Sequence, residues 1–303
     1  MFCFVIKLAG IPIEVRCRYE ENLEFLKDYI IDANTDREPL FTVEPAEEDL
    51  QRIQDGFSRM DKAAGLITYR RTEPYLENNA IHALLAEKLA EHYILLMHGS
   101  AMCMDGQAVI FTAPSGTGKS THAHLWRDLF DDGSGRIWMI NDDKPLLRVR
   151  DEEVRVFGTP WDGKHHLSRN ASAPLKAIVR LERGEENRLM TMGAAAAFQL
   201  LFRQVFASPN RETMRKIADL EKKLLINADH IGIGFYRLVC NMEPEAALVA
   251  WEGISAAVPS AMAAVAAVAA VILAECYCHC QVIMHLRYIR HLNDCTGDDF
   301  FGA

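Results

Sequence analysis

Residues 113–120 read Ala113-Pro114-Ser115-Gly116-Thr117-Gly118-Lys119-Ser120, and this stretch decides the fold that we expect. An apolar run at 107–112 precedes it and a helical pattern at 120–130 follows it, which predicts strand, glycine-rich turn and helix in that order. In such a turn, backbone N–H groups and the helix N-terminus hold phosphates, the lysine reaches the outer phosphates, and the serine hydroxyl ligates magnesium. The predicted nucleotide-binding residues are Pro114, Ser115, Gly116, Thr117, Gly118, Lys119, Ser120 and Thr121.

One residue departs from the usual phosphate-loop pattern, because Ala113 stands where that pattern has its first glycine. A methyl group is a modest change there, provided that the backbone angle φ is negative. The alternative interpretation is a glycine-rich turn between a strand and a helix that binds no ligand.

The composition is that of an ordinary globular protein. The chain has 303 residues, of which 50% are hydrophobic and 25% charged, and this length allows two domains or one large α/β domain with an appended piece. A formal net charge of −9 argues against nonspecific binding to nucleic acid. Residues 1–13 read as strand, turn and strand and not as a signal peptide, so we expect a cytoplasmic protein with reduced thiols.

Residues 1–75 predict a small α+β region. A β-hairpin over 1–18 turns at Ala9-Gly10, and Pro12 is tolerable there only on an edge strand. Helical patterns near 21–31 and 47–64 flank an extended piece at 40–43.

Residues 76–255 predict an α/β domain with a mixed sheet. It opens with an amphipathic helical stretch that starts at Pro74, and Asp105-Gly106 is a strong hairpin signal just before the phosphate loop. The remaining strands are predicted at 94–97, 137–140, 146–150, 154–157, 177–181, 188–192 and 235–240, and the remaining helices at 194–205, 211–227 and 244–254.

Two adjacent carboxylates, Asp142 and Asp143, follow the predicted strand at 137–140. A carboxylate at this place can hold the magnesium ion that bridges the outer phosphates, and a second one can take the proton from an attacking hydroxyl. The alternative is a solvated acidic turn. Delivery by an apolar strand to the edge where ligands bind in α/β sheets favours function.

Other candidates have weaker signals. His98 lies one hairpin before the phosphate loop and can face the same cleft, although a lone histidine can equally be structural. Lys164, His165 and His166 are either phosphate or substrate contacts or an exposed basic loop; Trp161, in the same loop, is a packing anchor or a substrate contact. Arg180 and Arg183 are either surface charges or phosphate contacts.

Several of these runs together resemble the HPr kinase/phosphorylase family, which shares its nucleotide core with ATP-dependent phosphoenolpyruvate carboxykinase. They resemble more closely the HPr-kinase-like bacterial proteins, some of whose relatives are peptide serine kinases. The resemblance covers about residues 76–255 and rests on His98-Gly99-Ser100, the run from Ser115 to His122, Asn141-Asp142-Asp143-Lys144-Pro145 and Gly158-Thr159-Pro160-Trp161.

The resemblance implies a role for each matching residue. Lys119 and the loop amides would hold the nucleotide phosphates, Ser120 and Asp143 would hold magnesium, Asp142 would be the catalytic base, and His98 would lie beside the transferred phosphate. The second signature of HPr kinases, a loop with glutamate and arginine, is not recognisable, and the residues 158–164 stand in its place. HPr as the acceptor and a reverse phosphorylase activity are therefore not implied.

The sequence thus predicts a kinase that uses ATP and Mg²⁺ to phosphorylate a hydroxyl, in serine or threonine of a protein or peptide. The alternatives are a nucleotide-binding sensor or scaffold with little or no catalysis, and a small-molecule kinase. No Asn-Lys-x-Asp guanine signature is present, which weakens a GTPase interpretation. A homo-oligomer stays open.

The tail at 256–303 does not continue the pattern. Residues 255–274 form an alanine- and valine-rich run, interrupted by Pro259, whose length is near that of a membrane helix. Because alanine contributes little apolar area, we expect a packing or oligomerisation helix instead of a membrane segment. The cysteines and histidines at 276–280 alternate along the chain and lack the paired spacing of zinc sites.

Overall fold

A computed structural model describes residues 1–32, 38–114, 116–163 and 166–256 of the chain. It has the predicted α/β class, with mixed sheets. In chain order the elements are β1 (Phe2–Leu8), β2 (Ile11–Cys17), α1 (Glu20–Leu26), the 3-10 helix η1 (Lys27–Tyr29), β3 (Ile30–Ile31), β4 (Phe41–Val43), α2 (Glu47–Ala63), α3 (Glu73–Ala90), β5 (Ile94–Leu96), β6 (Ser100–Met104), β7 (Gln107–Thr112), α4 (Lys119–Phe130), β8 (Ile137–Asn141), β9 (Leu146–Val149), β10 (Val154–Phe157), β11 (Ser172–Arg183), β12 (Arg188–Thr191), α5 (Ala194–Gln204), α6 (Arg211–Ile231), β13 (Gly234–Cys240) and α7 (Glu245–Ala256).

The N-terminal strands form a sheet of their own, in the order β3-β1-β2-β4. The predicted hairpin is confirmed, and its turn residues Ala9 and Gly10 have φ angles of 48° and 81°. Two expectations for this region were wrong. The helix expected to run to residue 31 ends at Leu26, because Ile30 and Ile31 pair with β1 instead.

Pro12 does not lie on an edge strand, since β2 has β1 on one side and β4 on the other. The ladder with β4 begins one residue later, at the pair Ile13 and Phe41. On the side of β2 that faces β4, the Pro12 carbonyl accepts a hydrogen bond from the Leu40 N–H, and the ladder needs no donor from Pro12. The missing N–H of the proline therefore costs the sheet nothing there.

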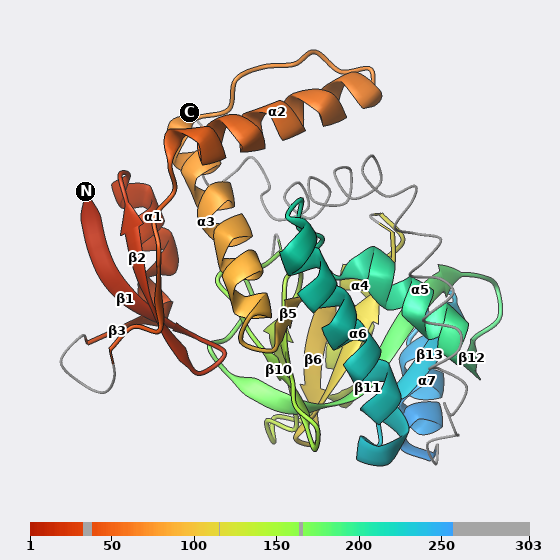
Figure 1. The fold of residues 1–303 in the computed structure, drawn as a ribbon. Helices are drawn as coiled ribbons and strands as arrows, with labels where there is room; N and C mark the ends of the chain where they lie inside the picture. Colours follow the sequence, from red (N-terminus) through yellow and green to blue (C-terminus); the bar gives the residue numbers. More distant parts are fainter. Residues whose placement is uncertain (33–37, 115, 164–165, 257–303) are drawn as a thin grey trace.

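The helix expected to be amphipathic, α3, is buried on almost every side. It contacts α1, α2 and β4 on the N-terminal side and β5 and α6 on the other, so both of its faces need apolar residues (Figure 1). A single cluster of buried side chains runs from Ile6 through Leu76 to Phe235. The division between the first two domains at residue 75 remains a prediction, and this cluster extends across it.

The large sheet has β8, β6, β7 and β11 as adjacent strands. The first residues of β11 pair with β10, which continues to β9 and β5, whereas its later residues pair with β13, which continues to β12. Helices α4 and α7 cover one face of this sheet, and α3, α5 and α6 cover the other (Figure 1). Alternate side chains of β7 are buried on opposite faces of the sheet, because Ile110 belongs to one buried cluster and Phe111 to the other.

The strand directions bring several ends together. Strands β7, β11 and β13 are parallel, and β8 runs the same way because both β7 and β8 are antiparallel to β6. The carboxyl ends of these four strands and the beginning of β6 therefore lie along one edge of the sheet. Residues that follow β7 and β8 or precede β6 must meet there.

None of the helices in the described residues combines the length and apolarity needed to cross a membrane. The expectations for the alanine-rich run and for the cysteines and histidines of the tail lie outside the described residues, apart from the end of α7.

Candidate functional site

The segment that joins β7 to α4, residues 113–120 with the first two residues of the helix, is called the glycine loop below. Gly116 and Gly118 have φ angles of 75° and 119°, and no atom lies within 4 Å of a Cβ placed on either residue. Glycine is therefore required by the backbone conformation and not by a lack of space, so the loop is open to a ligand. The Ala113 backbone has no positive φ, and its buried methyl group packs beneath α4. Ser115 lies outside the described residues.

Two cations contact the carbonyl groups of the glycine loop. Lys119 Nζ donates to the Ala113 carbonyl at 3.3 Å. Arg183, at the end of β11, donates from Nη2 to the Gly116 carbonyl at 2.6 Å and from Nε to the Thr117 carbonyl at 3.1 Å. Because the carbonyl and N–H of one planar peptide unit point in opposite directions, the Gly118 N–H points away from Arg183. Arg183 thus fixes the loop, whereas Arg180 pairs with Glu182.

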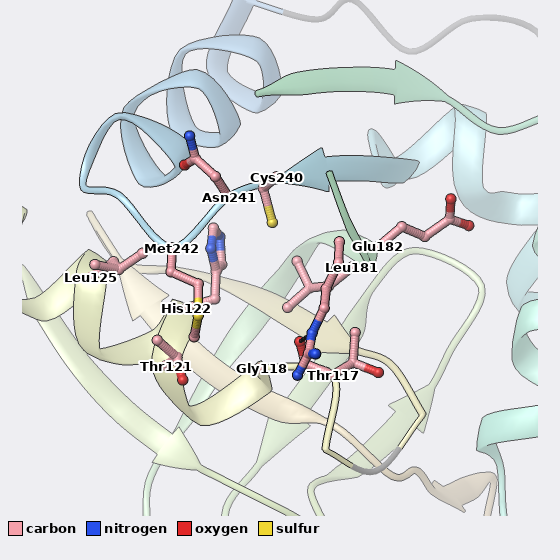
Figure 2. Close-up of a pocket in the computed structure, with 11 residues that line it drawn as sticks. Thr117, Gly118, Thr121, His122, Leu125, Leu181, Glu182, Cys240, Asn241 and Met242 are labelled. Carbon is pink, nitrogen blue, oxygen red and sulfur yellow. Dashed lines mark hydrogen bonds between the residues drawn. The ribbon is translucent and has the colours of Figure 1, made fainter. Parts of the chain in front are cut away.

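A narrow groove runs beside the glycine loop (Figure 2). Thr121 and Leu125 of α4 line one side of it, and Asn241 and Met242, just after β13, line the other. Its volume of about 20 Å³ admits little more than one water molecule. Met242 is 58% exposed, so its side chain can move and widen the groove.

The residues after β8 form a buried turn, Asn141–Lys144. The Asn141 side chain organises it, because its Oδ1 accepts from the N–H groups of Asp143 and Lys144. Its Nδ2 donates to the carbonyls of Thr159 and Trp161, at 3.1 and 3.2 Å. One amide side chain therefore shapes the turn and attaches it to the loop after β10.

Asp142 points toward the glycine loop. Its carboxylate accepts a hydrogen bond from the Gly163 N–H, and a Cβ at Gly163 would overlap that carboxylate. Asp142 and Ser120 line the same small cavity, of about 10 Å³, together with Leu167. The structure therefore brings a carboxylate from β8 to the serine of the glycine loop.

Asp143 points elsewhere and belongs to a buried trio. Its Oδ2 lies 2.9 Å from Lys144 Nζ and its Oδ1 3.2 Å from His98 Nδ1, while Lys144 Nζ is 3.1 Å from that same ring nitrogen. Burial by itself would raise the pKa of the Asp143 carboxyl, but Lys144 and His98 outweigh it and hold this pKa below its usual range. Burial, and then Lys144, lower the pKa of His98. The trio is therefore an ion pair beside a neutral imidazole.

His98 reaches this trio because it lies just before β6, separated from that strand by Gly99. Gly99 lets the backbone come close, since a Cβ there would lie 2.9 Å from the Phe111 carbonyl oxygen. The Gly99 N–H donates to the Asp143 carbonyl, and the Ser100 hydroxyl donates to the Asp142 carbonyl. The strand preceding the glycine loop and the turn after β8 are thus bonded through the first residues of β6.

The remaining candidates are spread around the loop after β10. Trp161 is 2% exposed, its Nε1 donates to Asn78, and its ring stacks on His82 at 4.6 Å. A side chain so placed packs the core and does not face an acceptor. His166 is exposed and contacts Asp162, whereas Lys164 and His165 lie outside the described residues.

Sequence reasoning gave no role to Asn141, Lys144 or Gly163, and it left Arg183 between two interpretations. Lys144 lies in the run Asn141–Pro145, on which part of the family resemblance rests. Its position between an apolar strand and a proline was the sequence feature that could have drawn attention to it. Nothing local distinguishes Gly163 from other loop glycines, because its role depends on a carboxylate 21 residues away.

These residues suit a nucleotide with its magnesium ion. The open backbone and Lys119 match phosphate groups, and the Ser120 hydroxyl faces a carboxylate across a small cavity. The described residues gather no cluster of three or more His, Cys, Asp or Glu side chains that could hold a metal. Magnesium needs none, since it takes one or two carboxylates together with phosphate oxygens and water.

No protein-family model matches the chain, and no curated protein matches it. Among solved structures, the chain is similar to the Hpr(Ser) kinase/phosphatase from Coxiella burnetii, with 10% identity and a TM-score of 0.29 over 52% of this chain and 95% of that one. This is a distant structural relation. It assigns no role to any residue, so the roles that follow rest on the contacts of this chain's own side chains.

Proposed function

We propose that this protein is a kinase that uses ATP and magnesium to phosphorylate a hydroxyl group, in serine or threonine of a protein or peptide. The observation that carries the proposal is the cavity shared by Ser120 and Asp142. It joins a helix-capping glycine loop, which suits phosphates, to a carboxylate that binding alone would not require.

The glycine loop would hold the phosphates. The Gly118 N–H and the N-terminus of α4 offer donors, and Lys119 can leave the Ala113 carbonyl for a phosphate oxygen. Arg183 keeps the loop in this shape by binding the two carbonyls on its other side. The groove beyond Thr121 would receive the nucleoside once Met242 moves.

Asp142 would act as the base. The Gly163 N–H fixes its carboxylate toward the cavity, where it can accept the proton of an acceptor hydroxyl while the oxygen attacks the γ-phosphorus, the bond to the β-phosphate oxygen breaks and ADP leaves. In the tautomer whose Nδ1 accepts from Lys144, a neutral His98 carries its proton on Nε2 and could donate it in a hydrogen bond to a phosphate oxygen without adding a charge. Most of the catalysis would come from positioning and charge neutralisation.

Magnesium would be held by the Ser120 hydroxyl and by Asp143, which Lys144 keeps ionised and which would have to turn from that ion pair toward Ser120; Asp142, which already lines the cavity of Ser120, is the alternative ligand. Bound magnesium would neutralise charge on the phosphates. The Mg²⁺ concentration that gives half-maximal activity should therefore rise in Asp143→Asn. If Asp142→Asn shifts this concentration and Asp143→Asn leaves it unchanged, Asp142 is the magnesium ligand and Asp143 is the base.

The function is tested with γ-labelled ATP on the full chain, with serine and threonine peptide libraries and a cell lysate as acceptors. Asp142→Asn should bind ATP like the wild type and transfer phosphate about 10²- to 10⁴-fold more slowly. Lys119→Ala should bind ATP more weakly, and Glu152→Gln, an exposed carboxylate in the turn between β9 and β10, should match the wild type.

The rival functions predict other results. A nucleotide-binding sensor would bind ATP but label no acceptor, and Asp142→Asn would then change nothing. A small-molecule kinase would yield a labelled product of low mass, identified by mass spectrometry.

A further inference from the structure

A second cavity, of about 350 Å³, lies beside the loop after β10, the loop whose Gly163 donates to the Asp142 carboxylate. One wall comes from α1 and η1 of the N-terminal region and the other from described residues at 159–162 and 166–170. This volume is near the lower end of the range for small-ligand pockets, so it admits one long side chain or a short peptide segment.

In the described parts of the loop after β10, residues 162–163 and 166–168, the residues that line this cavity alternate with residues of the candidate active site. Leu167 lines the cavity of Ser120 and Asp142, whereas its neighbours His166 and Ser168 line the second cavity. Asp162 also lines the second cavity, and the next residue, Gly163, donates to the Asp142 carboxylate. A peptide whose hydroxyl reaches Asp142 can therefore place a neighbouring side chain in the second cavity by extending past this one loop.

The charges of the second cavity are mainly negative. Its wall carries the carboxylates of Glu24, Asp28 and Asp162. Lys27 is paired with Glu24, and Asp162, whose side chain is 10% exposed, lies 3.0 Å from Nδ1 of the exposed His166 ring and accepts from the Ser168 N–H at 3.4 Å. Asp28 is an exposed carboxylate at the rim. Among the described residues of its wall, carboxylates therefore outnumber ammonium groups.

A buried hydroxyl adds an independent observation. Tyr29 lines the second cavity and is 5% exposed, and its hydroxyl has no hydrogen-bond partner among the described residues. The Ser168 hydroxyl lies in the opposite wall, beside the Asp162 carboxylate. Buried polar groups in proteins are nearly always hydrogen-bonded, so the Tyr29 oxygen is suited to a donor that enters from outside.

We infer that the second cavity binds a lysine or arginine side chain of the phosphoacceptor, close in sequence to the hydroxyl that is phosphorylated. Asp28 and Asp162 would attract the cation, the hydroxyl oxygens of Tyr29 and Ser168 would accept its N–H groups, and the Phe25 ring would pack along its carbon stem. This inference rests on the proposed kinase function, and it specifies that the acceptor is a basic peptide.

The test uses serine peptide libraries in which one position at a time is arginine, citrulline or alanine. Citrulline has the shape of arginine without its charge. The wild type should phosphorylate the arginine set about tenfold faster than the citrulline set at one or two positions, as expected for one hydrogen bond between charged groups. In Asp28→Asn and Asp162→Asn this ratio should fall toward one, while Glu21→Gln, which removes an exposed carboxylate of α1 outside the cavity wall, should keep it.

Tyr29→Phe separates binding from folding. Because it removes a hydroxyl without a partner among the described residues, it should leave the urea midpoint unchanged or raise it, and yet lower the ratio of arginine to citrulline. An unchanged ratio in Tyr29→Phe, Asp28→Asn and Asp162→Asn together would overturn the inference.

A binding measurement separates failure of the inference from failure of the kinase function. Fluorescein-labelled arginine and citrulline peptides are titrated with the full chain without ATP, and anisotropy is recorded. If phosphorylation occurs without an arginine preference, the kinase function stands and the inference is wrong. A second outcome is that no peptide is phosphorylated. If arginine peptides then bind more tightly than citrulline peptides and Asp28→Asn abolishes the difference, the cavity binds a basic side chain although the kinase function is wrong. If the two peptides bind equally, the inference is overturned.

Discussion

The glycine loop and the turn Asn141–Lys144 lie at the same edge of the large sheet, but they are built in opposite ways. The glycine loop is open, and its two glycines with positive φ have free space around them. In the turn, the four residues are at most 6% exposed, and their side chains are bonded to segments that lie up to 46 residues away in the sequence. One half of the site is therefore a local backbone shape, and the other half is a product of tertiary contacts.

This difference has consequences for mutation. A change in the glycine loop should affect ligand binding and leave the fold intact, because few contacts are lost. A change in the buried turn should affect stability as well, because a charge or a carbonyl group would be left without its partner in a medium of low dielectric constant. Matched pairs of variants, one in each half, test this contrast.

The largest effect is expected from the two lysines. Lys144→Met should lower the free energy of unfolding by about 3–5 kcal/mol, since it leaves the buried Asp143 carboxylate without its ammonium partner. Lys119→Met should weaken nucleotide binding but change the unfolding free energy by less than about 1 kcal/mol. Urea denaturation of both variants decides the matter, and equal destabilisation would contradict the contrast.

The second comparison concerns two glycines. Gly163→Ala should lower kcat about 10²-fold with little change in the affinity for ATP, because the new methyl group displaces the Asp142 carboxylate. Gly116→Ala meets no atom but must adopt a positive φ, which costs about 1–2 kcal/mol. Its effect should appear in nucleotide affinity. If Gly163→Ala keeps full activity, Asp142 does not need the position seen here.

Acid should destabilise the protein through His82, which stacks on Trp161 behind the buried turn. Burial, and then Lys144, lower the pKa of His82 to about 3 from an ordinary value of 6.5. Between these values the unfolded chain binds a proton that the folded chain does not, so stability falls as the pH falls, by up to about 1.4 kcal/mol per pH unit.

His82→Phe tests this expectation, because it keeps a ring against Trp161 and cannot titrate. Neither nitrogen of His82 has a hydrogen-bond partner among the described residues, so the substitution breaks no bond there. Urea midpoints measured from pH 7 to pH 4.5 should decline less steeply in the variant. An identical decline would show that His82 does not carry the pH dependence.

The smallest effect is expected at Arg183. Arg183→Gln should weaken nucleotide binding about five- to tenfold, or roughly 1 kcal/mol, because two loop carbonyls lose their charged donor. Arg180→Gln, on the same strand but paired with Glu182, should bind nucleotide like the wild type. Fluorescence titration with a labelled ATP analogue measures the nucleotide affinity of both variants. Equal affinities would show that Arg183 does not stabilise the glycine loop for nucleotide binding.

The sequence alone was sufficient for features that few neighbouring residues determine. Ala9-Gly10 and Asp105-Gly106 predicted their hairpins, because a two-residue turn with positive φ admits few residue types. The order strand, glycine loop and helix followed from residues 107–130 in the same way. The placing of Asp142 at the loop's edge also followed, from an apolar strand that ends in a polar pair.

Only the tertiary structure decided what surrounds these features. Periodicity indicated a half-exposed helix at α3, but sheets and helices on both sides bury it almost completely. It also decided that Asp142 faces Ser120 while Asp143 faces Lys144, although the two residues are adjacent and chemically identical. Turn signals and periodicity depend on dihedral angles within a few residues, whereas burial and partner choice depend on which distant segments share the same space.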